Sequence, residues 1–251
     1  MEERIQKQRW LDIGEQEAIK NVPILFAGAG IGSVIAECAL RFGFENITIV
    51  DGSKVEESHL NGQNYTSSNI GKYKAESLAK YLKKINPQAD IKYHNVSINH
   101  DNIRNLIKGH RIAINTLDFV DDIPFLFDDI CKEYGVHVLH PYNFGWAGFL
   151  TIVNPNGYQL SELAQNPTDF ELKLAEYVAK YGEFWRLPSD WMNPIVEQYG
   201  KKDMETSKLQ LSIASWIVSG YCVNAMYNLV VGKPVQYFPK FYLSSFLLGT
   251  H

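Results

Sequence analysis

A glycine-rich turn holds the first residues whose types and spacing could do chemistry. Gly28, Gly30 and Gly32, followed by Ser33, stand between a short apolar run and a segment whose apolar residues have helical spacing. Glycines at such a turn let backbone N–H groups approach a phosphate, and the positive end of the following helix favours the anion. Asp51 lies 19 residues after Gly32, at the end of the next apolar run. A carboxylate there can accept hydrogen bonds from ribose hydroxyls, so the pair favours a bound nucleotide over a simple strand-to-helix turn.

The elements that must position this turn alternate between strand and helix up to about residue 140. Apolar runs predict strands at 22–27, 47–50, 111–115, 136–139 and 149–153, and alternating apolar residues predict one at 91–98. Apolar residues at helical spacing predict helices at 33–42, 74–85, 103–108 and 125–134. Parallel strands need crossover connections, and helices usually supply them. The expected fold is therefore α/β, with a Rossmann-like, mostly parallel sheet flanked by helices.

The alternation also suggests how the chain is organised, as one domain over residues 1–251. Its four parts are a helical lead-in at 1–21, a nucleotide-binding core at 22–154, a variable insertion at 155–206, and a C-terminal helix with an extended tail at 207–251. The insertion lacks the strand–helix pattern and is rich in loops and aromatic residues. We expect it to consist of loops and short helices.

Composition excludes several classes of protein. The 24 basic and 28 acidic residues give a net charge of −4, so no broad basic field attracts nucleic acid or an anionic membrane surface. Three dispersed cysteines, Cys38, Cys131 and Cys222, exclude a disulfide scaffold and a four-cysteine zinc site. The charged N-terminus does not fit a signal peptide, and the most apolar stretch, 216–231, is too short to span a membrane. We expect a cytoplasmic protein without structural zinc.

Further motifs, taken in order, resemble those of the ThiF/MoeB/HesA family of adenylating enzymes, which are related to ubiquitin-activating enzymes. The family pattern runs G-x-G-G-x-G-S, D-x-D-x-V-x-x-S-N-L-x-R-Q, G-x-x-K, I-N-P and T-D-N. Here it reads AGAGIGS at 27–33, DGSKVEESHLNGQ at 51–63, GKYK at 71–74, INP at 85–87 and NTLDF at 115–119. The last apolar helix, at 209–231, also looks like the family's closing helix. The resemblance covers nearly the whole chain outside 155–206, and the combined order of the motifs is far more specific than any one of them.

The resemblance implies ATP-dependent adenylation of the C-terminal carboxylate of a small ubiquitin-like or sulfur-carrier protein, or of a peptide, with release of pyrophosphate. In this reading the three glycines cradle the phosphates, and Asp51 binds the ribose. Asn61 and Gln63 would lie beside the triphosphate, Lys74 would neutralise charge on the α- and β-phosphates, and Asp118 would hold Mg²⁺. Positioning and charge neutralisation are what phosphoryl-type transfer mainly requires.

The family also implies a homodimer, because each of its sites is built across a twofold interface. An N-terminal arginine from the partner subunit reaches the γ-phosphate in these enzymes. The matching segment here is RIQKQR, which offers Arg4, Lys7 or Arg9, and Lys7 best fits the family spacing. The resemblance thus adds Lys7 to the expected catalytic residues.

The chain departs from the family pattern at several positions near the phosphates. Gly62 replaces the arginine of the R-Q pair, and glycine cannot act as a bidentate cation. Ser53 replaces the second aspartate, His59 the asparagine of S-N-L, and Ala29 a glycine of the turn. These changes imply weaker use of ATP, another source of positive charge, or a protein that binds without catalysing.

The positions of cysteine and histidine narrow the mechanism further. No cysteine lies in 155–206, where thioester-forming relatives usually carry one, so an adenylate-only mechanism is expected. The three cysteines fall on apolar or amphipathic helix faces and are expected to be structural thiols. His137 and His140 lack a third metal ligand nearby. The following aromatic stretch, 141–146, could line a groove for an extended peptide or simply pack in the core.

Two alternatives to adenylation remain open from the sequence. Gly62 motivates a non-catalytic module that binds a nucleotide or a partner. The glycine turn with Asp51 would also suit an NAD(P)-dependent oxidoreductase. Against the oxidoreductase stand Lys74 and Asp118 at their family positions, and the lack of an evident Tyr-x-x-x-Lys pair.

Overall fold

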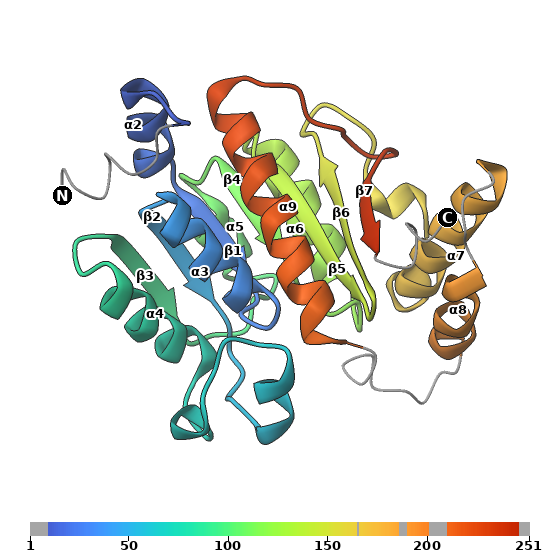
Figure 1. Cartoon of the computed structure of the whole chain (residues 1–251), viewed down its shortest axis with the longest axis horizontal. Coiled ribbons are helices and arrows are strands. Elements are labelled where there is room, and N and C mark those ends of the chain that lie inside the picture. The colour runs from blue at the N-terminus through green and yellow to red at the C-terminus, as the bar shows by residue number, and fades with distance from the viewer. Residues whose placement is uncertain (1–9, 165, 186–189, 201–209, 246–251) are drawn as a thin grey trace.

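A seven-stranded sheet forms the centre of the computed structural model, which describes residues 10–164, 166–185, 190–200 and 210–245 (Figure 1). The strands are β1 (Ile24–Ala27), β2 (Asn46–Val50), β3 (Asp90–His94), β4 (Ile112–Asn115), β5 (His137–Phe144), β6 (Ala147–Val153) and β7 (Tyr242–Ser245). Their order is β3-β2-β1-β4-β5-β6-β7. Strands β1 to β5 pair in parallel, and β6 and β7 join antiparallel at one edge. The expected mostly parallel α/β fold is confirmed.

Helices cover both faces of this sheet. The helices of the described residues are α2 (Ile13–Asn21), α3 (Gly32–Phe42), α4 (Lys74–Ile85), α5 (Ile103–Ile107), α6 (Ile123–Glu133), α7 (Phe170–Phe184), α8 (Asn193–Tyr199) and α9 (Ser212–Val231). In Figure 1, α3, α4 and α9 lie in front of the sheet, while α5 and α6 lie behind it. Helices α7 and α8, from the expected insertion, stand beside the β7 edge. No helix in the described part of the chain is both long enough and apolar enough to span a bilayer.

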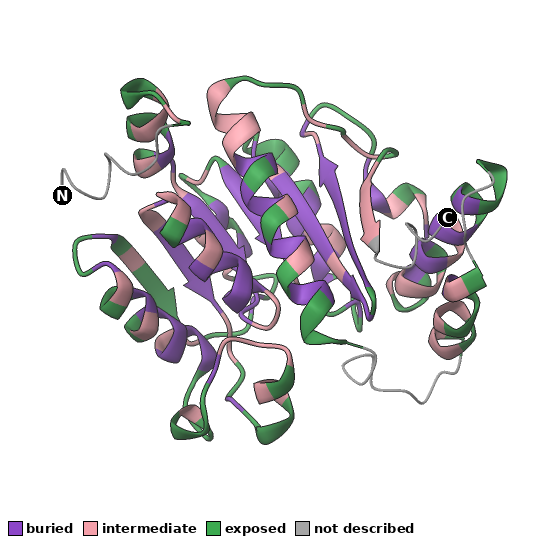
Figure 2. Ribbon diagram, viewed as in Figure 1, coloured by how far each residue is buried: buried purple, intermediate pink, exposed green. Residues whose placement is uncertain are grey.

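The core explains why the central strands are continuous apolar runs in the sequence. In β1, Ile24 and Phe26 belong to the apolar cluster under α3, α4 and α9, while Leu25 and Ala27 belong to the cluster under α5, α6 and α7. A strand covered on both faces needs apolar residues at every position. Figure 2 shows the result, with the central strands buried and the exposed residues gathered on the outer sides of the helices and on the loops.

The structure corrects the strand limits at two places that matter for the site. Strand β3 ends at His94, not at residue 98, and residues 95–98 instead form a loop at the carboxyl edge of the sheet. Strand β5 continues to Phe144 and turns back into β6. His140 and Asn143 interrupt its apolar pattern although both are buried, which is why the sequence predicted a strand that ends at residue 139. Pro141 and Phe144 are also buried, so they do not line an open groove.

Candidate functional site

The glycine turn joins β1 to α3 at the point where the strand order reverses. Gly28 has φ +96°, and a side-chain carbon there would collide with the Thr116 hydroxyl and lie 2.9 Å from the Thr116 carbonyl oxygen. Glycine is therefore required at this position, because both the backbone conformation and the close approach of β4 exclude a side chain. The N–H of Gly28 donates to the Val50 carbonyl at 2.9 Å, which ties the turn to β2. Ligands of open α/β sheets bind at such a reversal.

Ser33 and Gln63 connect the turn to the segment after β2. The Ser33 hydroxyl donates to the Gly30 carbonyl at 2.6 Å and accepts the N–H of Asn64 at 2.9 Å. Its hydrogen bonds are thus used inside the protein. The Gln63 amide nitrogen would lie 3.5 Å from a side-chain carbon placed at Gly30. The Gln63 amide oxygen is buried and has no hydrogen-bond partner, so this side chain can still accept a hydrogen bond at the turn.

Asp51 follows β2 directly and holds two backbone N–H groups. Its Oδ2 accepts from Ala29 at 2.7 Å, and its Oδ1 accepts from Ser53 at 2.7 Å. A carboxylate has about four acceptor positions, so it can accept further hydrogen bonds from a ligand. The contact with Ala29 also fixes the carboxylate against the glycine turn. Asp51 can therefore bind a ligand and shape the turn at once.

Lys74 is the first residue of α4, and it is buried with only 7% of its surface exposed. Among the described residues, the hydrogen-bonding neighbour of its Nζ is the Nε2 of His59, at 3.4 Å. The Nδ1 of His59 accepts the N–H of Glu56 at 2.9 Å, so a neutral imidazole carries its proton on Nε2. Two N–H donors then face each other, and an anionic oxygen beside them could accept hydrogen bonds from both.

Charges around Lys74 link it to the other predicted site residues. Burial lowers the pKa of Lys74, while the carboxylates of Asp51, Asp118 and Glu56 act in the opposite direction. Asp118 is exposed as a residue, yet the protein surrounding its carboxyl group raises its pKa, and Lys74 opposes that shift. Burial, together with the charge of Lys74, lowers the pKa of His59. The ends of β2 and β4 and the start of α4 thus bring two carboxylates and a lysine into one electrostatic neighbourhood.

A cleft of about 230 Å³ opens beside this neighbourhood, at the carboxyl ends of β1, β2 and β4. Its lining combines polar and apolar groups, among them Gly28, Asp51, Ser97, Ile98, Leu117 and Asp118. The 95–98 loop packs so closely that a side chain on Gly52 would lie 2.6 Å from the Ser97 backbone nitrogen. The cleft therefore has apolar walls, with a carboxylate at Asp51 and another at Asp118, which suits a flat, partly apolar ligand with hydroxyl groups.

The remaining predicted residues differ in how the structure places them. Asn61 is exposed at the end of a short 3-10 turn, Glu57–Asn61, beside Gly62. Lys7 lies outside the described residues. No cluster of three or more metal-binding side chains occurs in the described parts of the chain. Asp118 alone still fits Mg²⁺, because this ion usually keeps several waters and needs one or two carboxylates plus substrate phosphates.

Tyr65 also lies at the candidate site, although no pattern in the sequence points to it. Its side chain is buried, and its hydroxyl donates to the Ala29 carbonyl at 2.7 Å and lies 3.4 Å from the Lys74 carbonyl. It thus joins the glycine turn to the start of α4. A single tyrosine in a polar loop carries no sequence signal for such a contact.

Comparisons with known proteins identify the family of the chain. The model of the ThiF family matches residues 3–249. The adenylyltransferase and sulfurtransferase UBA4 of Saccharomyces cerevisiae (strain ATCC 204508 / S288c) is 31% identical over 146 residues, which are 57% of this chain and 33% of UBA4. The SAMP-activating enzyme E1 of Haloferax volcanii is 22% identical over 147 residues, covering 57% of this chain and 53% of that enzyme. This chain thus matches about a third to a half of the length of these relatives.

Solved structures support the same fold. PaaA superposes with a TM-score of 0.69 at 16% identity, over 93% of this chain and 72% of PaaA. MccB of Escherichia coli with AMPCPP and MccA gives 0.66 at 14% identity, over 94% of this chain and 66% of MccB. At these identities the likeness concerns the fold alone. The family match spans nearly the whole sequence, and the chain therefore belongs to the ThiF family.

Proposed function

We propose that this protein binds Mg·ATP and adenylates the C-terminal carboxylate of a small ubiquitin-like protein, a sulfur carrier or a peptide. The observation that carries the proposal is the meeting of Asp51, Lys74 and Asp118 at the carboxyl edge of the sheet, beside a cleft and a glycine turn. Relatives that the chain resembles include an adenylyltransferase and a SAMP-activating enzyme, which supports the same reaction class.

In the proposed reaction, an oxygen of the substrate carboxylate attacks the α-phosphorus of ATP. The bond from that phosphorus to the oxygen bridging the α- and β-phosphates breaks, and pyrophosphate leaves with its electron pair. The adenosine lies in the cleft with Asp51 at its ribose. The glycine turn, Asn61 and Gln63 line the triphosphate, with Ser33 holding the turn in shape. Mg²⁺, held by Asp118, would offset the negative charge of the phosphates.

Lys74 and His59 have the clearest role in this proposal. Their facing N–H donors lack an acceptor in the described structure, and a phosphate oxygen would supply one. Lys74 brings a positive charge, whose effect is strong because the side chain is buried. His59 would supply a neutral donor near Gly62, where the family has an arginine.

A second subunit fits the same proposal. Helix α9 is apolar around most of its circumference, and Ile213 and Trp216 are exposed on it, the latter at 58%. Aromatic side chains are enriched in protein interfaces, and this end of α9 is therefore our candidate for the contact between subunits. We therefore include a homodimer in the proposal, with Lys7 reaching the γ-phosphate across the interface. Sedimentation of wild type and Trp216→Arg would test it, and an unchanged monomer in both would refute it.

The first experiment is calorimetry of Mg·ATP binding to wild type, Asp51→Ala and the exposed control Asp101→Ala. We expect binding by wild type and the control, and loss in Asp51→Ala. Candidate carriers are then tested by pyrophosphate exchange, in which Lys74→Ala and Asp118→Ala should abolish the signal. Failure of wild type to bind millimolar ATP would refute the proposal.

Gly62 supports one competing function, a ThiF-family protein that binds a nucleotide or a partner without catalysis. Such a protein would bind Mg·ATP but give no pyrophosphate exchange with any carrier. Tighter binding of NAD than of ATP would instead favour an oxidoreductase.

A further inference from the structure

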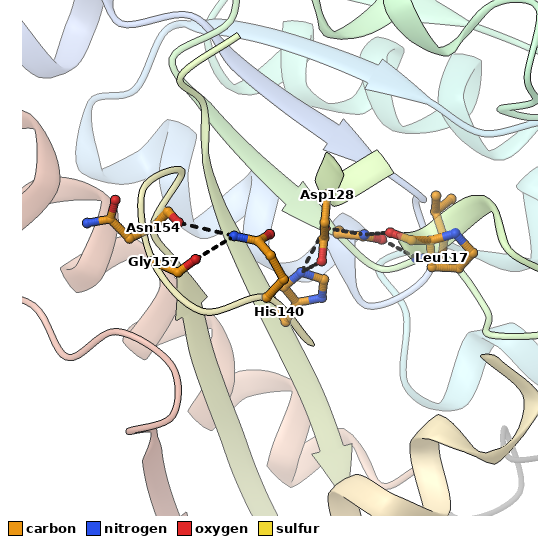
Figure 3. Close-up of polar contacts among 8 residues, drawn as sticks. Leu117, Asp128, His140, Asn154 and Gly157 are labelled. Atoms are coloured by element: carbon orange, nitrogen blue, oxygen red, sulfur yellow. Dashed lines mark hydrogen bonds and ion pairs between the residues drawn. The ribbon is translucent and has the colours of Figure 1, made fainter. Parts of the chain in front are cut away.

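A buried polar network lies directly behind the loop that carries Asp118. Figure 3 shows the side chains of Asp128 and His140 facing each other, with Leu117 on the far side of Asp128. Asp128 comes from α6 and His140 from β5, and both are buried, His140 completely. The His140 Nε2 lies 2.9 Å from Asp128 Oδ2 and 3.0 Å from Oδ1. Neither residue lines the cleft.

Asn115, the last residue of β4, connects this pair to the loop. Its amide nitrogen donates to Asp128 Oδ1 at 3.1 Å and to the Pro124 carbonyl at 3.1 Å. Its amide oxygen accepts the N–H of Leu117 at 3.2 Å. The orientation of this amide is unambiguous, because a carbonyl can only accept and a backbone N–H can only donate. The chain of contacts thus runs from His140 to the backbone just before Asp118.

Stability alone does not account for such a network. Burying a carboxyl and an imidazole between a helix and a sheet incurs a desolvation cost, and apolar side chains of similar size are often as stable or more so. The second ring nitrogen of the histidine, His140 Nδ1, is also buried and has no hydrogen-bond partner. The network acts on a short piece of backbone. The Thr116 hydroxyl donates to the Ala27 carbonyl of β1, and the Asn115 amide oxygen accepts the N–H of the next residue, Leu117.

We propose that Asp128 and His140 are positioning residues that, through Asn115, hold the Leu117–Asp118 backbone in the direction that aims Asp118 at the nucleotide-bound Mg²⁺. The inference rests on the proposed function for the role of Asp118. The network itself is a property of the unliganded protein. It can therefore be tested apart from catalysis.

The direct test is hydrogen exchange of the Leu117 amide in the unliganded protein. Asp128→Asn keeps the size of the side chain but turns an N–H toward a donor, and it should speed Leu117 exchange at least tenfold relative to amides of β2. His140→Gln keeps an N–H donor, so the Leu117 amide in this variant should retain most of its protection from exchange. Asp129→Asn, an exposed neighbour on the same helix, should change nothing. Equal exchange at Leu117 in folded Asp128→Asn and wild type would overturn the proposal.

A kinetic readout then separates positioning from general destabilisation. In pyrophosphate exchange, Asp128→Asn should raise the Mg²⁺ concentration for half-maximal rate several-fold, while KM for ATP at saturating Mg²⁺ stays unchanged. An equal rise in the Mg²⁺ concentration for half-maximal rate and in KM for ATP would show a structural role only and would refute positioning. If wild type shows no ATP binding, the proposed function fails. The Leu117 exchange result still decides whether the network fixes the loop.

Discussion

Restoring the missing arginine at Gly62 is the perturbation whose outcome the structure defines best. Gly62 has φ −137°, which any residue can adopt, and a side-chain carbon there would meet its nearest neighbour, the Ser215 hydroxyl, at 3.9 Å. Gly62→Arg should therefore fold without strain, unlike a substitution at Gly28. Its guanidinium would extend from the same segment that carries His59 and Gln63, two residues of the proposed phosphate site.

The gain in affinity follows from the strength of a charged hydrogen bond. Hydrogen bonds to charged groups contribute about 1.5–3 kcal/mol, and Gly62 is half-buried, which favours the lower end. Since 1.4 kcal/mol corresponds to a factor of ten, we expect Gly62→Arg to bind Mg·ATP about tenfold more tightly. Because the gain is electrostatic, it should shrink as ionic strength rises.

Calorimetry of wild type, Gly62→Arg and Gly62→Gln at low and high ionic strength would measure this. The glutamine control is polar but shorter and uncharged, so it should bind like wild type. An arginine variant that is folded but binds ATP no better than the glutamine variant would refute the reasoning. It would mean that position 62 does not face the phosphates in this chain.

Three further outcomes follow from single contacts or charges. Gly28→Ala should lower the free energy of unfolding by roughly 2 kcal/mol or more in urea titrations, because it combines positive φ with a collision at Thr116. Tyr65→Phe should weaken stability by about 1 kcal/mol and loosen Mg·ATP binding, because the Ala29 carbonyl loses its donor. Burial, reinforced by Asp118, raises the pKa of Glu171 from 4.5 to about 7. Since the folded state favours the protonated form, stability should fall as pH rises from about 4.5 through 7, by at most about 3 kcal/mol. Glu171→Gln should remove that part of the pH dependence, and an unchanged pH profile in the variant would contradict this.

The sequence predicted the central strands well because they are buried on both faces. A short, wholly apolar run such as that of β1 indicates a buried strand. A glycine turn followed by apolar residues at helical spacing indicates the start of a helix. The prediction failed in β5, where buried polar residues hide the strand pattern. The sequence offers no third metal ligand near His140, and the partner of this histidine in the structure, Asp128, lies on a helix that the sequence gives no reason to pair with it.

The site could be predicted only where topology dictates proximity. Asp51 and Asp118 follow neighbouring parts of a parallel sheet, so their positions at one edge follow from the strand order. The contact between Lys74 and His59 depends instead on the path of a long polar loop, which no periodic pattern specifies. Tyr65 illustrates the same limit, because its contact with Ala29 is set by that loop path alone.

The charge balance of the site leads to a last prediction. The charged groups that act on Lys74 are the carboxylates of Asp51, Asp118 and Glu56. This chain also lacks the arginine of the family pattern, because Gly62 replaces it. A bare triphosphate would therefore meet more negative than positive charge. We expect ATP without Mg²⁺ to bind far more weakly than Mg·ATP, and Gly62→Arg to narrow that difference. Titrations with ATP in EDTA and in excess Mg²⁺ would measure both effects. Equal affinity of wild type under the two conditions would show that positive charge reaches the phosphates from elsewhere, with Lys7 across a dimer interface as the first candidate to substitute.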